Sequence, residues 1–233
     1  GWIAALDAVF VGSEYSKGAV VSRRLSQAPQ LADKIIVSSN PMFIDEYHKF
    51  AGVEKRNLVV LTNRFDVEKD PWATLDLFKA AKAAHPDWEF QICTGRPTLR
   101  SNDPALVHYA KSLESQGVLT IRAGLTKEEY HRTLAQAKVM VSNSPEENFG
   151  YCIVEAINYN CVPLLRKAGS HMELVDYNPN CLFRFAASTS AQLVALEHAM
   201  SDEVQDDFPT HRTRLLAAPT SAMSFIANYL KEL

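Results

Sequence analysis

The sequence predicts an α/β protein built on a Rossmann-like, doubly wound parallel sheet. Short apolar runs alternate with segments of helical periodicity along most of the 233 residues, the pattern of repeated strand–helix units. The run at residues 58–62 is almost continuously hydrophobic, as expected for a strand covered on both faces. Helix starts are marked by an N-cap residue followed by proline, as at Asp70-Pro71 and Asp103-Pro104.

The expected strands are short apolar segments spread along the chain. They fall at residues 7–13, 34–38, 58–62, 88–93, 118–121, 138–142, 161–165 and 180–185. In doubly wound folds ligands bind at the carboxyl ends of the strands. Functional residues are therefore expected in the loops after residues 62, 94, 122 and 144.

The expected helices lie between these strands. Ser13 is a candidate cap for the first, Gly117 ends another, and Thr126 with Glu129 forms a capping box. The helices fall at residues 13–25, 70–85, 103–117, 126–136, 149–158, 191–200 and 220–233. The last is amphipathic and separate from the helices before it.

Composition narrows the function classes. The chain is 47% hydrophobic and 22% charged, with a formal net charge of −3, so nucleic acid is not an expected partner. No apolar run approaches the roughly 18–20 residues of a transmembrane segment. The four cysteines form no CxxC pair, which favours a reduced, cytoplasmic protein. The seven histidines form no HxH or HExxH pair, so no metal site is expected.

The most informative segment is acidic and follows the strand at residues 138–142. Glu147 and Glu155 are eight residues apart, about 12 Å along a helix. Two carboxylates at that spacing can each accept hydrogen bonds from one sugar, while a helix N-terminus near Gly150 offers N–H groups to phosphates. Taken alone, the pair is also typical of a loop charge and a solvated helix face.

The surrounding residues carry a family resemblance. Glu147, Phe149-Gly150 and Glu155 resemble the E-x7-E motif of retaining glycosyltransferases with two Rossmann-like domains (GT-B fold, group 4). Arg64 and Lys69 resemble the G-R-x4-K segment of that family, and residues 155–175 resemble its segment after the motif helix. Asn63, Asn160 and Cys181 stand where the family has glycine, and asparagine tolerates the left-handed conformation better than most residues.

The resemblance implies the site. The catalytic set is Glu147 on the transferred sugar with Arg64 and Lys69 on the diphosphate. The donor-binding set combines a ribose contact, made by Glu155, with residues at the helix start and in the base pocket. Its members are Glu155, Asn148, Phe149, Gly150, Arg122 and Gly95. The donor is a nucleoside diphosphate sugar with uracil or guanine as the base, and no metal or other cofactor is required.

The resemblance also implies the domain organisation of a hexosyltransferase-type enzyme that is incomplete by itself. Residues 1–33 are expected to be the remnant of an amino-terminal acceptor domain, residues 34–215 the nucleotide-sugar domain, and residues 216–233 a crossing helix. The missing acceptor half, or a partner chain that supplies one, is then the expected partner. Two alternatives stay open: a non-catalytic sugar-nucleotide-binding subunit, and a related epimerase or phosphorylase.

Overall fold

The computed structural model describes residues 2–42, 49–50 and 52–232. It contains a six-stranded sheet in the order β5-β4-β3-β6-β7-β8 and a small two-stranded sheet, β1-β2. All the strand pairs are parallel. The expected doubly wound α/β architecture is confirmed.

The strands are β1 (Val9–Val11), β2 (Ile35–Val37), β3 (Arg56–Leu61), β4 (Glu89–Cys93), β5 (Thr120–Arg122), β6 (Ala137–Ser142), β7 (Val162–Arg166) and β8 (Leu182–Phe183). The α-helices are α1 (Glu14–Arg24), α2 (Pro71–Ala84), α3 (Pro104–Ser115), α4 (Lys127–Gln136), α5 (Tyr151–Asn158), α6 (His171–Leu174), α7 (Thr189–Met200) and α8 (Asp202–Glu232). Short 3₁₀ helices lie at Trp2–Ala5, Pro29–Lys34, Val67–Lys69 and Pro179–Cys181.

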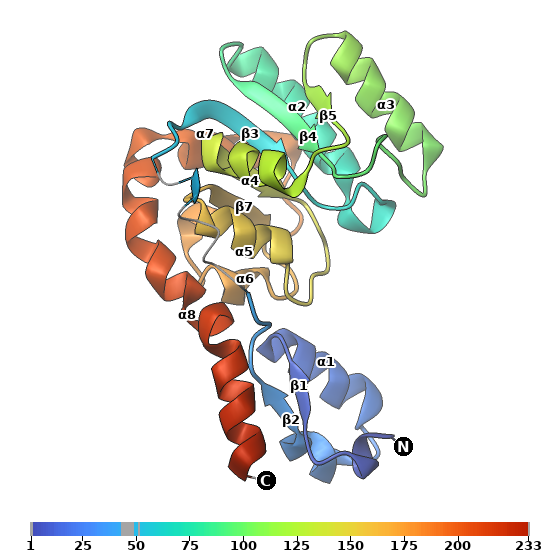
Figure 1. Cartoon of the computed structure of the whole chain (residues 1–233). Coiled ribbons are helices and arrows are strands. Elements are labelled where there is room, and N and C mark those ends of the chain that lie inside the picture. The colour runs from blue at the N-terminus through green and yellow to red at the C-terminus, as the bar shows by residue number, and fades with distance from the viewer. Residues whose placement is uncertain (1, 43–48, 51, 233) are drawn as a thin grey trace.

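The helices begin where the local chemistry predicts. The Asp70 side chain accepts from the N–H of Ala73, Pro71 opens α2, and the capping box of Thr126 and Glu129 opens α4. Helix α2 buries Leu75 and Phe78 completely against the sheet, and each such side chain contributes about 1.5–3 kcal/mol. Helix α2 packs with α3 and α7, whereas α4 packs with α5. Figure 1 shows these helices on the two faces of the large sheet.

The strand order creates a switch point between β3 and β6. After β3 the chain adds β4 and β5 on one side, and then returns to place β6 on the other side of β3. At such a point the loops after the two central strands diverge to opposite faces and leave a crevice at the carboxyl edge of the sheet. The loops after residues 61 and 142 therefore form the two walls of one crevice.

Two boundaries differ from the expected ones. Strand β2 pairs with β1 and not with the large sheet, so residues 35–37 lie with the amino-terminal segment, beyond the boundary expected after residue 33. The final helix is not separate either, because α8 runs continuously through Pro209 and Pro219. Packing overrides the local interruption, since α8 buries Leu216, Pro219 and Ala222 along one side.

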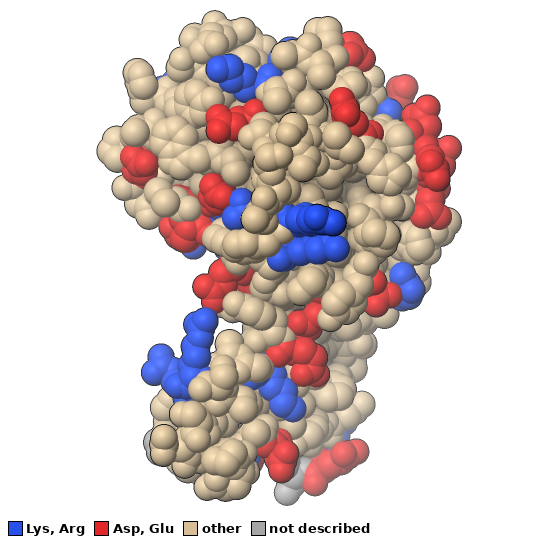
Figure 2. Space-filling view, turned by 180° about the vertical axis from the view of Figure 1, so that it is seen from behind, with Lys and Arg blue, Asp and Glu red and all other residues tan. Residues whose placement is uncertain are grey.

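Helix α8 connects the large sheet to the small β1–β2 unit. It packs against α5 and α7 near its start and reaches the small unit at its end (Figure 1). There Phe10 and Tyr229 meet edge to face at 5.5 Å. Seen from behind, the surface is hollowed between this unit and the sheet domain, with acidic groups above the hollow and basic groups below it (Figure 2).

Candidate functional site

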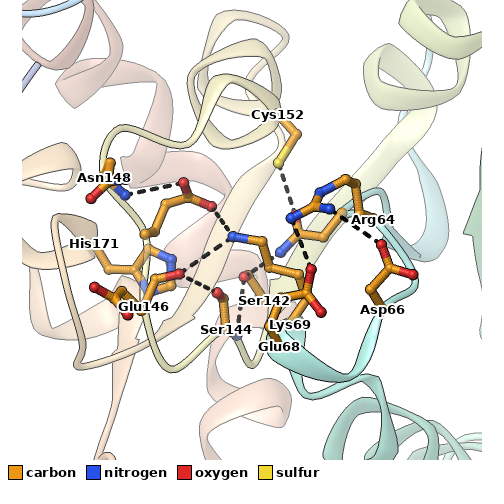
Figure 3. A network of polar contacts seen from close by, with 12 residues as sticks. Arg64, Asp66, Glu68, Lys69, Ser142, Ser144, Glu146, Asn148, Cys152 and His171 are labelled. Atoms are coloured by element: carbon orange, nitrogen blue, oxygen red, sulfur yellow. Dashed lines mark hydrogen bonds and ion pairs between the residues drawn. The ribbon is translucent and has the colours of Figure 1, made fainter. Parts of the chain in front are cut away.

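The centre of the candidate site is an ion pair across the crevice. Lys69 ends the short helix after β3, and Glu147 lies in the loop after β6; Lys69 Nζ is 2.8 Å from Glu147 Oε2. The two side chains are 15% and 17% exposed, so the pair is largely withdrawn from bulk water. Lys69 also donates to the carbonyl of Glu146 at 3.3 Å (Figure 3).

A tight turn holds the backbone of Glu147. Gly169 has φ +55°, and a Cβ there would lie 2.6 Å from the N and O atoms of Glu147. The N–H of Ser170 donates to the carbonyl of Glu147 at 2.9 Å. Only glycine permits this close approach. The turn at residues 169–170 therefore fixes the position of the Glu147 backbone, from which the carboxylate extends.

The loop continues as a coil up to Gly150, and the helix begins later than expected. Helix α5 starts at Tyr151, with Gly150 at φ +82° as its N-cap. A left-handed residue cannot continue a helix, so the expected helical start at residue 149 is wrong and Phe149 is a buried packing residue, 4% exposed. Gly150 has no side chain to bond the first N–H groups of α5, which suits an anion at this end.

Arg64 lies on the opposite wall of the crevice. Its guanidinium is 3.3 Å from the carboxylate of Asp66 and 3.0 Å from that of Glu68 (Figure 3). The Arg64 side chain is 62% exposed. Water screens such a pair strongly, so the guanidinium is readily released to a more highly charged anion. The structure thus places Lys69 beside Glu147 but keeps Arg64 apart from both.

Glu155 lies on α5 and contacts side chains of α4, next to a cavity lined by the loops after β3 and β4 and by the start of α4. It accepts from the hydroxyl of Tyr130 at 2.9 Å, and His131 Nε2 lies 4.0 Å from it. Burial, reinforced by the Glu155 charge, raises the pKa of Tyr130, so the phenol stays protonated and donates. Tyr130 lines the cavity, and thus connects Glu155 to it.

The cavity has a volume of about 390 Å³. Its walls come from the loops after β3 and β4 and from the start of α4, and include Arg64, Gly95, Thr126, Lys127 and Tyr130. Gly95 was expected in the donor site from the sequence, whereas Tyr130 and Thr126 were not. The capping box of Thr126 and Glu129 could have indicated both residues, because it marks the start of α4 at the edge of the sheet where ligands bind.

Arg122, expected beside the base, does not line this cavity. It is the last residue of β5, and its carbonyl accepts from the N–H of Thr94 at 2.9 Å. That contact shapes the loop that carries Gly95. Arg122 thus reaches the cavity wall through its backbone.

The Asn63 side chain links the two walls of the crevice. Its Nδ2 donates to Ser142 Oγ at 2.6 Å, and Cys152 Sγ donates to Asn63 Oδ1 at 2.8 Å (Figure 3). Burial raises the pKa of Cys152 to about 12, so its thiol remains a donor. Asn160 adopts the expected left-handed conformation (φ +51°), whereas Asn63 does not; its side chain instead ties the loop after β3 to β6 and α5.

His171 lies fully buried next to this turn. Its Nδ1 is 2.8 Å from the carbonyl of Arg166, so Nδ1 carries the proton. Among the residues that the structure describes, Nε2 has no hydrogen-bond partner. Desolvation lowers the pKa of His171, which keeps the ring neutral. Arg166 in turn bonds Asp70 and Asn143. The histidine therefore supports the turn as a neutral group.

The acidic groups of the crevice do not assemble into a metal centre. Within the part of the chain that the structure describes, no three His, Cys, Asp or Glu side chains are close enough to hold a metal ion. Asp66 and Glu68 face the Arg64 guanidinium. Arg64 and Lys69 supply positive charge to the crevice, and Arg96, Arg100 and Lys127 add positive charge along the cavity wall.

A family model described as glycosyl transferases group 1 matches residues 43–213, well over half of the chain. The chain belongs to this glycosyltransferase family. The match spans both walls of the crevice and the whole of the large sheet.

Solved glycosyltransferase structures share the fold of this family member. A mutant of TarM from S. aureus, in complex with fondaparinux, α-GlcNAc-glycerol and UDP, superposes with a TM-score of 0.76 at 15% identity; 98% of this chain and 44% of TarM are covered. Pneumococcal O-GlcNAc transferase GtfA, with UDP and GlcNAc, gives 0.70 at 11% identity, covering 98% and 45%. Sucrose-phosphate synthase from Thermosynechococcus elongatus gives 0.68 at 18%, covering 99% and 61%.

These likenesses fix the architecture of the glycosyltransferase chain as a Rossmann-like half of a GT-B fold. The chain spans between 44% and 61% of the length of these three proteins. In the described residues, no helix has both the length and the apolar character needed to cross a membrane.

Proposed function

We propose that this chain is the donor-binding half of a retaining glycosyltransferase that transfers a hexose from a nucleoside diphosphate sugar. The observation that carries the proposal is the pairing of Lys69 with Glu147 at the switch point, beside the cavity behind Tyr130. A cation for the leaving group and a carboxylate for sugar hydroxyls thus meet at one point, at the edge where such folds bind ligands.

The proposed pose follows the crevice. The nucleoside occupies the cavity lined by Gly95 and Tyr130, with Glu155 accepting from the ribose hydroxyls. The diphosphate lies over the Gly150 end of α5, between Arg64 and Lys69. The sugar then extends toward Glu147. Because TarM and GtfA were solved with UDP, uracil is the first base to test.

In this proposal the main catalytic contribution of the protein is electrostatic stabilisation of the leaving group. When the bond between the sugar and the diphosphate breaks, negative charge grows on the departing phosphate oxygens. Arg64 and Lys69 can neutralise that charge by charge-assisted hydrogen bonds, without any metal ligand. Glu147 orients the sugar through its hydroxyls. An acceptor hydroxyl attacks from the face that the leaving group vacates, which retains the anomeric configuration, and its proton passes to an oxygen of the departing diphosphate.

In this proposal the Lys69 ammonium has two alternative ion-pair partners, Glu147 and the diphosphate. In the structure it neutralises Glu147; an incoming diphosphate, which carries more charge, competes for the same ammonium. Releasing Glu147 makes its oxygens available to the sugar. The ion pair therefore holds the site in a neutral, ordered state before the donor binds.

Calorimetric titration tests the proposal directly. The chain is titrated with UDP, GDP and ADP, and then with UDP-glucose, UDP-N-acetylglucosamine, GDP-mannose and ADP-glucose. We expect one nucleoside diphosphate to bind and one of its sugars to bind more tightly. No binding of any member would contradict the proposed function. Anomeric analysis of the product by NMR tests retention.

The four free cysteines are consistent with the cytoplasmic location that we propose for the protein.

A further inference from the structure

The first turn of α1 touches the loop that carries Glu147. The Ser13 hydroxyl donates to the carbonyl of Asn148 at 2.8 Å, and the Ser16 hydroxyl donates to the same oxygen at 3.2 Å. The Tyr15 hydroxyl donates to Glu146 Oε1 at 3.2 Å. Residues on both sides of Glu147 are thus held by a segment more than 130 positions earlier in the chain.

This turn of α1 is itself firmly anchored. Ser13, only 4% exposed, is the N-cap and accepts from the N–H of Ser16 at 3.0 Å. The Glu173 carboxylate accepts from the N–H groups of Glu14 and Tyr15, both at 2.8 Å. The N–H groups that a helix start leaves without intrahelical partners are therefore satisfied, and a carboxylate is favourable at that end.

Glu173 belongs to α6, which directly follows the turn at residues 169–170 that packs on Glu147. The loop with Glu147 thus contacts two separate segments. The glycine turn fixes its backbone from within the sheet domain, and α1 fixes its two flanking residues from the small unit. Figure 1 shows that α1 lies with β1 and β2 in the small unit.

We propose that residues 13–16 position Glu147, and hence the transferred sugar, from the small amino-terminal unit. This inference rests on the proposed function, because it uses the assignment of Glu147 to the sugar. The described residues that line the nucleoside cavity include none from α1. The turn should therefore affect recognition of the sugar without changing recognition of the nucleotide.

The test compares the free nucleoside diphosphate with its sugar conjugate in variants of this turn. The probes are UDP and UDP-glucose, or the pair that the initial titration selects. In Ser13→Ala and Tyr15→Phe, the extra affinity contributed by the sugar should fall about threefold to tenfold, the range for a lost hydrogen bond. Affinity for the diphosphate alone should stay within about twofold. Ser13→Thr, which keeps the hydroxyl, should restore the sugar increment.

Ser188→Ala is the matched control. Ser188 caps α7 as Ser13 caps α1, accepting from the N–H of Ala191 at 3.3 Å, so its loss removes an equivalent cap elsewhere. The control should lower thermal stability as Ser13→Ala does but leave the sugar increment intact. Tyr15→Phe does not alter the cap, and so keeps the test valid if Ser13→Ala folds poorly.

Hydrogen exchange gives a second readout that needs no ligand. In Ser13→Ala, peptides covering residues 143–150 should exchange faster, while those covering residues 59–66 on the other wall should not. Unchanged exchange at residues 143–150, or equal loss of affinity for UDP and UDP-glucose, would overturn the inference.

A parallel Glu147→Gln titration separates the two proposals. If Glu147→Gln loses the sugar increment and Ser13→Ala keeps it, the positioning role is wrong and the proposed function stands. If Glu147→Gln also keeps the increment, both are wrong.

Discussion

Lys69 Nζ and Glu147 Oε2 lie 2.8 Å apart although 78 positions separate the two residues in the chain. The pair joins the loop after β3 to the loop after β6 across the switch point of the sheet. In the proposed pose both loops are needed, because the loop after β3 supplies Arg64 and Lys69 for the diphosphate and the loop after β6 supplies Glu147 for the sugar. Their meeting makes the crevice a single site.

Removing the ammonium should weaken the diphosphate contact. Lys69→Ala should reduce affinity for the nucleoside diphosphate by about 1.5–3 kcal/mol, the range for charged hydrogen bonds. Affinity for the bare nucleoside should change far less. Calorimetry measures both, with Lys111→Ala on the exposed side of α3 as the control. An unchanged diphosphate affinity would contradict the role of Lys69.

Arg64 offers a test in both directions, because Asp66 and Glu68 compete for its guanidinium. Arg64→Ala should weaken diphosphate binding, whereas Glu68→Gln should strengthen it modestly by releasing the guanidinium. Repeating the titration at high salt should shrink both effects, since exposed charges are screened. If Glu68→Gln instead weakens binding, the carboxylate contributes to the site in another way.

The two carboxylates should be separable by their ligands. Glu155→Gln and Tyr130→Phe both disturb the 2.9 Å hydrogen bond beside the cavity, so both should weaken nucleotides with or without a sugar. Glu147→Gln should leave the free nucleoside diphosphate bound normally and lose the affinity that the sugar adds. Equal losses for both ligands in Glu147→Gln and Glu155→Gln would mean that the roles are wrongly divided.

Buried His171 should make the fold sensitive to mild acid. Its folded pKa is lowered from 6.5 by burial, so below about pH 6.5 the unfolded chain binds a proton that the folded chain does not. Stability therefore falls as pH drops from 7.5 to 5.5. In His171→Asn, whose side chain can still donate to the Arg166 carbonyl, that fall should be smaller. Urea unfolding at the two pH values measures it.

The matching control for the pH experiment is His108→Asn, which replaces an exposed histidine on α3. It should keep the pH dependence of the natural chain. An identical fall in stability for His171→Asn and the natural chain would show that His171 is not the group responsible.

Turnover separates an enzyme from a binding subunit. The residues that we assign to the donor come from one side of the hollow between the sheet domain and the small unit. The chain spans 44% of the length of TarM and 61% of that of the sucrose-phosphate synthase. We expect this 233-residue chain to bind its sugar nucleotide but transfer the sugar slowly. Joined to an acceptor half, it should transfer efficiently. Brisk turnover by the chain alone would contradict this expectation, and silence after joining would favour the binding subunit.

The fold class was predictable because its signals are local. Apolar runs such as residues 58–62 and caps such as Asp70 and Thr126 act over a few residues, so strands and helices could be placed before their neighbours were known. The placement of Arg64, Lys69 and Glu147 after strands followed from the same pattern. Their functional roles are still predictions.

Non-local contacts decided the rest. The sequence alone could not show that β6 returns beside β3, that β2 pairs with β1, or that α8 continues through Pro219. It also overlooked Tyr130 and the grip of Ser13 on Asn148, which joins segments 135 positions apart. The physical reason is that such contacts depend on the order of strands and the packing of helices, which bring together groups that no local pattern relates. The sequence by itself determined the alternation of strands and helices around the large sheet and the polar groups that follow its central strands. Only the tertiary structure decided which of those groups meet.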